Sequence, residues 1–464
     1  MAHAARALLE VRHMAEPYNL MIRPMHEYLV DVNEKTGKLE PGLATEWAYE
    51  NNGNQVRLKL RPNVPFHKNG GTMTADDVKF GWEQVTLPDS LQGQGPYWRR
   101  VTKSFDVVSD TEFVMKLNTV DSNIVTAMSE EQSGIEVQSR ASFDKNGPAT
   151  YKTGPYNGTG PYQWQDGVDG QFVRYERVPY QHWRAQPAFP EFEYRHMKEP
   201  STRLAALLAG EVQLADLPQD LRGQATARGY KALAGKASSF RVFLRHFCCY
   251  LNDPNDQAKG WMHPNSPLMD VRVRKALSKA IDRNELNKAF FNGKGETMYN
   301  FHLHPTRPGW NPDWEKNFKS EYGYDLNAAK QLLQEAGYSA AKPLKTSLHI
   351  QNLPNVPGAP DIIESIAQYW RAAGVDVALL QEDNNEILTK QRAFAYQNDF
   401  FIVGTSSGQN IGSNAYFSSI PPRNTGMEDP TGDALLQKIN DELDEKKQAE
   451  MWKQYGDWVY QQHY

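Results

Sequence analysis

Residues 61–85, RPNVPFHKNGGTMTADDVKFGWEQV, run from the end of a strand through a proline-rich turn into the start of a helix. Pro62 and Pro65 end the strand, because proline has no N–H to donate to a sheet ladder. Thr74 and Asp77 have the spacing of a capping box, in which side chains satisfy the free amides at a helix start. The stretch therefore predicts a strand, a turn and a capped helix, and it is poor in catalytic groups.

The neighbouring segments extend this unit. Residues 55–61, QVRLKLR, alternate apolar and basic side chains, as expected for a half-buried strand. Val78, Trp82 and Val85 recur at the spacing of one helix face. EFVMKLN, which starts at Glu112, repeats the alternation and predicts another strand nearby.

Between residues 270 and 405 the pattern changes to helices that alternate with single strands. Asp270, Asp282 and Asp325 each precede an apolar helical pattern and are predicted helix caps. Residues 361–380 give a helix, a glycine stop and a strand. This alternation predicts an α/β domain.

Three further segments carry simpler expectations. Residues 201–216, STRLAALLAGEVQLAD, predict a helix that ends near Gly210 and is followed by a short strand. The tail from Gly432 to Tyr464 predicts one long polar helix. Residues 153–162, TGPYNGTGPY, contain a small local duplication that is dense in turn formers and predict a crossing between domains.

The composition is that of a folded soluble protein with more than one domain. The chain has 464 residues, 23% of them charged and 39% hydrophobic, and this length predicts two or three domains. Its 51 Lys and Arg against 56 Asp and Glu give a net charge of -5 without long blocks of one sign. This balance gives no reason to expect nucleic acid or an anionic membrane as a partner.

The two cysteines, Cys248 and Cys249, are adjacent. A zinc site needs more ligands at wider spacing, so a cysteine-based metal site is not expected. They are interpreted as two small buried apolar residues at a strand end. The alternative is a disulfide between neighbours that forms a platform for a ligand.

Several segments together resemble the extracellular solute-binding proteins of family 5, the receptors that feed peptide, nickel, opine and some oligosaccharide ABC importers. The matching blocks follow the family order and are PGLATEW (41–47), VRLKLRPNVPFH (56–67), TADDVKFGWE (74–83), GTGPY (158–162), DVRVRKALSKAIDRNEL (270–286) and YGYDLNAAKQLLQEAGY (322–338). Spread over some 300 residues, they are far more specific than any one block.

The resemblance implies an α/β fold of the periplasmic-binding-protein type II, with two lobes, a hinge and an extra domain inserted in the first lobe. The boundaries it implies are 1–26, 151–245 and 396–464 for lobe I, 27–150 for the insert, and 246–395 for lobe II. The ligand would lie in the cleft and be enclosed by a hinge motion of the lobes.

The sequence departs from the family pattern at both ends. The signal peptide, the first strand and the final C-terminal segment of the family are not evident, so the chain is expected to be either a piece of a longer protein or a divergent member. The full-length protein is expected in the periplasm or, as a lipoprotein, at the cell surface.

The resemblance also directs attention to residues 399–417, DFFIVGTSSGQNIGSNAYF. Peptide-binding members hold the ligand's ammonium with an aspartate here, and its place falls on or near Ser407. Serine cannot neutralise a buried ammonium, so a free peptide amino terminus is a poor candidate ligand. The segment is interpreted as lining the cleft; the alternative is a plain surface loop.

The other candidate contacts each have a structural alternative. Trp98 and Arg99 could stack on a ligand and pair with an anion, or belong to a loop with one packed aromatic residue. The complete predicted set of ligand-binding residues is Tyr28, Trp98, Arg99, Tyr250, Asn252, Gly404, Thr405, Ser406, Ser407, Asn410 and Tyr416.

The predicted function is a receptor that captures a small organic solute, neutral or polar and resembling an oligosaccharide or a modified peptide, and docks as a monomer on an ABC permease. No cofactor is expected. The alternative of an enzyme, a glycoside hydrolase, would need two opposed carboxylates, but Asp76 and Asp77 are adjacent at a helix start. A nickel or opine receptor is the remaining alternative. His302 and His304 are interpreted as part of a surface passage and not as metal ligands.

Overall fold

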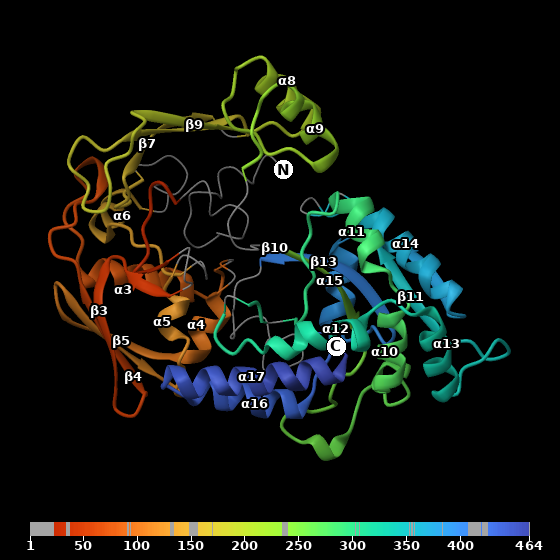
Figure 1. Ribbon diagram of the computed structural model, residues 1–464. Helices are drawn as coiled ribbons and strands as arrows, with labels where there is room; N and C mark the ends of the chain where they lie inside the picture. Colours follow the sequence, from red (N-terminus) through yellow and green to blue (C-terminus); the bar gives the residue numbers. More distant parts are fainter. Residues whose placement is uncertain are drawn as a thin grey trace. The chain divides into compact units, whose positions relative to one another are not determined.

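The computed structural model of the protein describes residues 23–33, 38–90, 92, 94–129, 134–147, 156–168, 170–233, 240–301, 303–305, 307–351, 353, 356, 358–382, 384–406, 419 and 426–463. The chain divides into two compact units, Met1–Ala232 and Leu233–Tyr464 (Figure 1).

The first unit is built on antiparallel sheets. Its elements are β1 (Val30–Val32), β2 (Leu39–Pro41), β3 (Ala44–Glu50), β4 (Gln55–Leu60), η2 (His67–Asn69), α3 (Ala75–Thr86), α4 (Gly95–Val101), β5 (Thr102–Ser109), β6 (Glu112–Leu117), α5 (Ile124–Ala127), α6 (Arg140–Asn146), β7 (Tyr162–Val168), β8 (Phe172–Arg177), β9 (Glu191–Arg195), α8 (Pro200–Leu208) and α9 (Gln219–Ala227). The strands form a β1-β2 pair, a β3-β4-β6-β5 sheet and a β7-β8-β9 sheet.

The strand, turn and capped helix predicted from residues 55–85 are confirmed as β4 and α3. Val56 and Leu58 are completely buried on one face of β4, and β6, the other predicted strand, pairs beside it. At the start of α3 the Asp77 carboxylate accepts the backbone N–H of Thr74 at 2.8 Å. Its second oxygen accepts the backbone N–H of Arg140 at 2.9 Å, so the cap also fixes the start of α6.

The second unit has one mixed sheet with helices. Its elements are β10 (Phe240–Phe247), η4 (Gln257–Lys259), η5 (Pro267–Met269), α10 (Val271–Lys279), α11 (Arg283–Phe291), α12 (Pro312–Tyr322), α13 (Leu326–Glu335), β11 (Lys345–Ile350), α14 (Ala359–Ala372), β12 (Asp376–Gln381), α15 (Asn384–Arg392), β13 (Asp399–Ser406), α16 (Pro430–Asp441) and α17 (Glu445–Gln462). The strand order is β10-β13-β11-β12; β11 is parallel to β12 and β13, and β10 is antiparallel to β13.

The predicted caps of this unit are confirmed. Asp270, Asp282 and Asp325 each accept backbone N–H groups at the starts of α10, α11 and α13. Trp370 of α14 is buried, donates its indole N–H to the carbonyl of Leu277 at 3.0 Å and packs against Phe400 of β13. This contact joins α14 and α10 to the sheet.

Two expectations about single elements are wrong. Residues 211–216 contain no strand, because the N–H groups of Glu211 and Val212 bond back to Ala206 in α8. The tail is two helices, α16 and α17, which lie side by side (Figure 1). Asp444 starts the second helix by accepting two backbone N–H groups at 3.0 Å, and α17 is amphipathic, with Trp452 and Tyr455 buried.

The lobe boundaries implied by the family resemblance remain a prediction. The described residues after 396, which that scheme assigned to lobe I, belong to the second compact unit. β13 lies inside the second unit's sheet, and Leu436 of α16 and Val459 of α17 share a hydrophobic core with Leu277 of α10. Backbone pairing and apolar burial both hold this segment in the second unit.

Asp77→Ala tests the cap that links α3 and α6. Loss of the hydrogen bonds that the carboxylate accepts from Thr74 and Arg140 should lower the free energy of unfolding by about 1–2 kcal/mol, measured by urea denaturation. The matched control is Asp76→Ala, whose side chain is 54% exposed and whose loss should cost less than about 0.5 kcal/mol. Equal midpoints for the two variants would contradict the capping role.

Candidate functional site

Tyr28 lies beside a carboxylate buried inside the first unit. Its hydroxyl donates to Oε1 of Glu136 at 3.0 Å, and both residues are buried. Burial raises the pKa of Glu136 to about 8, although the Tyr28 hydrogen bond opposes this. Glu136 is therefore mostly protonated at neutral pH, so Tyr28 contacts a neutral acid within the core. The contact of Tyr28 with a ligand stays a prediction.

Next to Tyr28, Glu27 forms the centre of a second buried polar group. Its Oε2 accepts the indole N–H of Trp183 at 3.2 Å, and Nε2 of His182 lies 3.5 Å away. Arg184 Nε lies 3.5 Å from the other carboxylate oxygen. Trp183 is also covered by the guanidinium of Arg61, 3.8 Å from the ring centroid. The group ties the segment before β1 to the loop after β8.

The GTGPY block has a structural explanation. The N–H of Gly160 donates to the carbonyl of Met25 at 2.9 Å, and a Cβ at Gly158 would lie 2.0 Å from that oxygen. Only glycine permits this approach. The imidazole of His67 lies 2.8 Å from the Gly160 carbonyl oxygen, and burial lowers its pKa to about 3, which keeps it neutral.

Trp98 and Arg99 lie on α4, where a loop was one expectation. Trp98 is completely buried in the core of the first unit, so it packs as the structural alternative proposed. Arg99 is exposed and donates to the carbonyl of Leu87 at 3.0 Å. The two side chains are directed to different surroundings, and their use by a ligand stays a prediction.

In the second unit the structure brings Tyr250 and Asn252 into one turn after β10. Tyr250 is 1% exposed and packs against Phe394. Asn252 donates its side-chain amide to the carbonyl of Lys259 at 2.8 Å, which closes the turn.

The segment expected to line the cleft is described only in part. Gly404 lies in β13 opposite Val242 of β10, and Thr405 and Ser406 complete the strand, with their side chains outside the description. Ser407, Asn410 and Tyr416 lie outside the described residues. Their roles remain predictions.

Cys248 and Cys249 form a disulfide and are completely buried. The bond agrees with the alternative of a disulfide between neighbouring cysteines. The burial agrees with the interpretation as two small buried residues at a strand end. Backbone bonds at 2.8 Å join Cys248 to Gly426 and Cys249 to Glu428. The buried disulfide offers no surface to a ligand. The two backbone hydrogen bonds hold the end of β10 against the segment before α16.

The second unit contains a buried imidazole between two carboxylates that no sequence motif predicted. His349 of β11 is 1% exposed; its Nε2 lies 2.9 Å from Oδ1 of Asp399, and its Nδ1 lies 2.9 Å from Oε2 of Glu382. The Nδ1 contact is short without the geometry of a hydrogen bond. Tyr396 and Lys390 also donate to Glu382.

The same contacts shift the pKa values of both acids. Burial raises the pKa of Asp399, but the His349 bond and two backbone N–H groups bring it below its usual range. Burial likewise opposes ionisation of Glu382, whereas the bonds from Lys390 and Tyr396 hold its pKa low. Both carboxylates are therefore ionised at neutral pH. The cluster fixes the start of β13 against the ends of β11 and β12.

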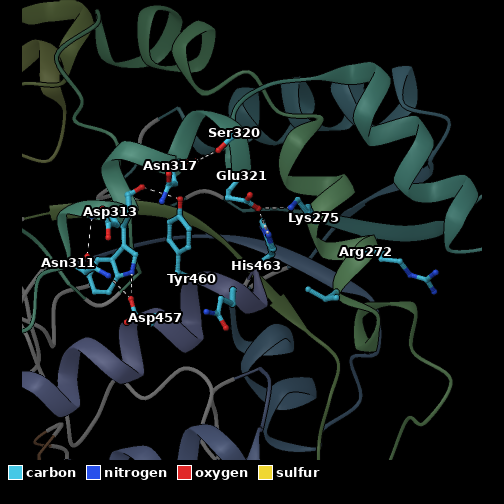
Figure 2. Close-up of a pocket in the computed structure, with 13 residues that line it drawn as sticks. Arg272, Lys275, Asn311, Asp313, Asn317, Ser320, Glu321, Asp457, Tyr460 and His463 are labelled. Carbon is cyan, nitrogen blue, oxygen red and sulfur yellow. Dashed lines mark hydrogen bonds and ion pairs between the residues drawn. The ribbon is translucent and has the colours of Figure 1, made fainter.

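The second unit also contains an open pocket of about 600 Å³ formed by α10, α12 and α17 (Figure 2). Trp314 and Tyr460 provide aromatic surface, and Asp457 accepts the Trp314 indole N–H at 2.8 Å. Nothing in the sequence pattern marked this pocket, because its lining residues come from three distant helices.

The described residues contain no group of three or more His, Cys, Asp or Glu that could hold a metal ion. Of the two histidines in the Pro-rich segment, His302 lies outside the description, and His304 is 34% exposed beside Glu296.

Comparison with known proteins decides the family. The family model described as "Bacterial extracellular solute-binding proteins, family 5 Middle" matches residues 38–428. The chain belongs to this family. The resemblance found in the sequence blocks is thereby confirmed.

Relatives of this family-5 chain include two named binding proteins. It is 26% identical over 380 residues to heme-binding protein A of Haemophilus influenzae. The matched region covers 77% of this chain and 64% of that protein. It is 25% identical over 402 residues to the dipeptide-binding protein of Escherichia coli, which covers 82% of this chain and 70% of that protein.

Solved structures confirm the predicted fold class for this family-5 chain. HbpA2 from Haemophilus parasuis superposes with a TM-score of 0.74 at 22% identity, covering 98% of this chain and 90% of that one. DppA from Helicobacter pylori in complex with the peptide STSA superposes with a TM-score of 0.71 at 18% identity, covering 98% and 88%. Within the described part of the chain, no helix has the length and apolarity to cross a membrane.

Glu136→Gln tests the neutral buried acid. Because the folded pKa lies above the unfolded value of about 4.5, the native state keeps a proton that the unfolded chain releases. The stability that this proton contributes is complete below pH 4.5 and is lost as pH rises through about 8. Glutamine should therefore flatten the fall in melting temperature between about pH 6 and 9.

Glu46→Gln, at a carboxylate whose side chain is 66% exposed, is the matched control. It should keep the wild-type slope of melting temperature against pH. An unchanged slope in Glu136→Gln as well would contradict the raised pKa.

His349→Leu tests the cluster at β11. The variant leaves Asp399 and Glu382 without their shared imidazole and should lose about 3 kcal/mol of stability at pH 7. Because the pKa values of Asp399 and Glu382 are lowered in the folded protein, the stability that these carboxylates contribute is present at neutral pH and is lost on acidification. The stability deficit of His349→Leu should therefore shrink below about pH 4.

The control is His304→Leu, at a half-buried imidazole outside the cluster, and it should remain within about 0.5 kcal/mol of the wild type. Denaturant unfolding at pH 7 and pH 3.5 supplies the comparison. A deficit that does not depend on pH would mean that lost packing explains the whole effect.

Proposed function

We propose that this protein is the substrate-binding receptor of an ABC importer, which captures a small organic solute and delivers it to a permease. The observation that carries the proposal is the family match over residues 38–428. The fold supports it, since receptor-type structures superpose on 98% of the chain. A receptor of this kind acts in the periplasm or at the cell surface, and we place the full-length protein there.

Within this function we propose a neutral or polar ligand, such as an oligosaccharide or a modified peptide. Residues 404–414, GTSSGQNIGSN, contain hydroxyl and amide groups but no acidic side chain. A buried ammonium needs an opposite charge, whereas hydroxyl and amide groups suit neutral donors and acceptors. The proposed contacts within this segment are Gly404, Thr405, Ser406, Ser407 and Asn410.

A thermal-shift screen tests the receptor function and its ligand. The purified protein is heated with sugars, peptides, opines, heme and nickel; a ligand at one hundred times its Kd should stabilise it by about 2.7 kcal/mol. The proposal expects a hit among neutral or modified solutes. Stabilisation by ordinary dipeptides or tripeptides at micromolar concentration would overturn the ligand assignment, and turnover of any hit would overturn the receptor function.

Ser407→Asp sharpens the ligand test by adding the missing carboxylate. It should increase affinity for peptides with a free amino terminus and weaken binding of the neutral hit. Ser407→Asn is the matched control, because asparagine has nearly the size of aspartate but no charge. It should not gain peptide affinity. Equal behaviour of the two variants would contradict the argument from charge.

A further inference from the structure

The adjacent cysteines lie where the end of β10 meets the segment before α16. β10 ends at Phe247, and the disulfide joins the next two residues, Cys248 and Cys249. Cys248 donates its backbone N–H to the carbonyl of Gly426, and the carbonyl of Cys249 accepts the backbone N–H of Glu428, both at 2.8 Å. We call the contact between residues 248–251 and residues 426–428 the β10 junction.

Two further contacts make the β10 junction tight. The carboxylate of Glu428 accepts the backbone N–H of Leu251 at 2.8 Å. Gly426 has a φ of +94°, and a Cβ on it would lie 2.5 Å from the carbonyl oxygen of His246. The junction therefore depends on a close approach of two backbones that glycine permits.

The β10 junction fixes where the chain returns after β13. β13 ends at Ser406, which pairs with Phe240 at the start of β10. Gly426 is bonded to Cys248, directly after the other end of β10. The chain that leaves β13 beside one end of β10 thus returns beside the other end, and the two bonds to Cys248 and Cys249 hold it there.

The disulfide contributes little as an ordinary cross-link. A disulfide stabilises a fold mainly by closing a loop in the unfolded chain, and in this model the effect grows with the number of residues in the loop. No residue lies between Cys248 and Cys249, so the unfolded chain is restricted as little as a disulfide can restrict it. The main effect of the bond falls on the backbone of the two cysteines.

That effect acts directly on the β10 junction. Successive side chains of an extended chain point to opposite faces, whereas a disulfide needs both Cβ atoms on one side, about 3.5–4.5 Å apart. The bond therefore excludes a fully extended backbone at the pair and fixes the directions of the Cys248 N–H and the Cys249 carbonyl. Without the bond the pair can extend, which turns these two groups away from Gly426 and Glu428.

We propose that Cys248 and Cys249 form a redox-sensitive latch, in which the disulfide holds the β10 junction closed and the dithiol form releases it. To close the latch, the thiolate of one cysteine attacks a small disulfide, and the thiolate of the other displaces that sulfur from the mixed disulfide. The S–S bond of the oxidant breaks, its two halves leave as thiols with the protons that the cysteines lose, and the Sγ–Sγ bond forms. A dithiol reductant reverses the exchange.

Burial decides when the latch can change state. Both cysteines are completely buried, so the exchange occurs before the second unit has packed or when the junction opens. The state is therefore set by the compartment in which the chain folds. In the periplasm or at the cell surface the latch is closed; this step rests on the proposed location, whereas the latch itself does not.

Amide hydrogen exchange of the full chain tests the latch. The chain is refolded from urea with cystamine or with dithiothreitol, and its intact mass distinguishes the disulfide from the dithiol by two hydrogens. Amides of residues 248–251 and 426–428 should exchange about tenfold faster or more in the dithiol form. Amides of α14, in the same unit, should exchange equally in both forms.

Two variants separate the bond from the junction. The double variant Cys248→Ala, Cys249→Ala cannot form the disulfide and should exchange fast at residues 426–428 with either reagent. Gly426→Ala keeps both cysteines but sets a Cβ against the His246 carbonyl, so it should exchange fast even as the disulfide. The matched control is Gly223→Ala, where a Cβ would meet no atom, and it should keep the wild-type response.

Three results would each overturn the proposal. The first is equal exchange at the β10 junction in the two wild-type forms. The second is faster exchange of the junction and α14 alike, which would make the bond a general stabiliser. The third is failure of the cysteines to form a disulfide with cystamine. None of these results bears on solute binding, which the thermal-shift screen decides separately.

Discussion

The structure of the second unit depends on the insertion of β13 between β10 and β11. Backbone N–H and C=O groups buried in a sheet must be paired, and β13 finds partners on both sides, from Phe240–Phe247 on one and from Ser347–His349 on the other. Its partners lie 50 to more than 150 residues earlier in the chain. This pairing brings His349, Asp399 and Glu382 together and fixes the direction in which the chain continues from Gly404.

The two buried carboxylate groups show how surroundings decide charge. Burial dominates at Glu136 and raises its pKa, although its carboxyl group accepts a hydrogen bond from the neutral hydroxyl of Tyr28. Asp399 is also buried, but His349 and two backbone amides bind its ionised form and lower its pKa. A buried carboxyl group thus serves as a neutral core group in one place and as an ionised hydrogen-bond acceptor in another.

Local chemistry made much of the secondary structure predictable. The cap at Asp77, the caps at Asp270, Asp282 and Asp325, and the alternation in β4 depend on residues a few positions apart, and all are confirmed. The predicted single C-terminal helix was wrong because a cap at Asp444 restarts the chain after α16. Helical periodicity alone cannot exclude such a break, since both helices keep their apolar faces toward one core.

The sequence by itself determined the family and the fold class, because its motifs are read along the chain: a capping box, the glycine-containing block GTGPY, and aspartates that start helices. Only the tertiary structure decided what surrounds each side chain. Trp98, which could have faced a ligand, is buried, and Tyr250 packs in an aromatic cluster. The His349 cluster and the pocket beside Lys275 unite residues far apart in sequence, so their burial, charge and partners exist only once the helices and strands have packed.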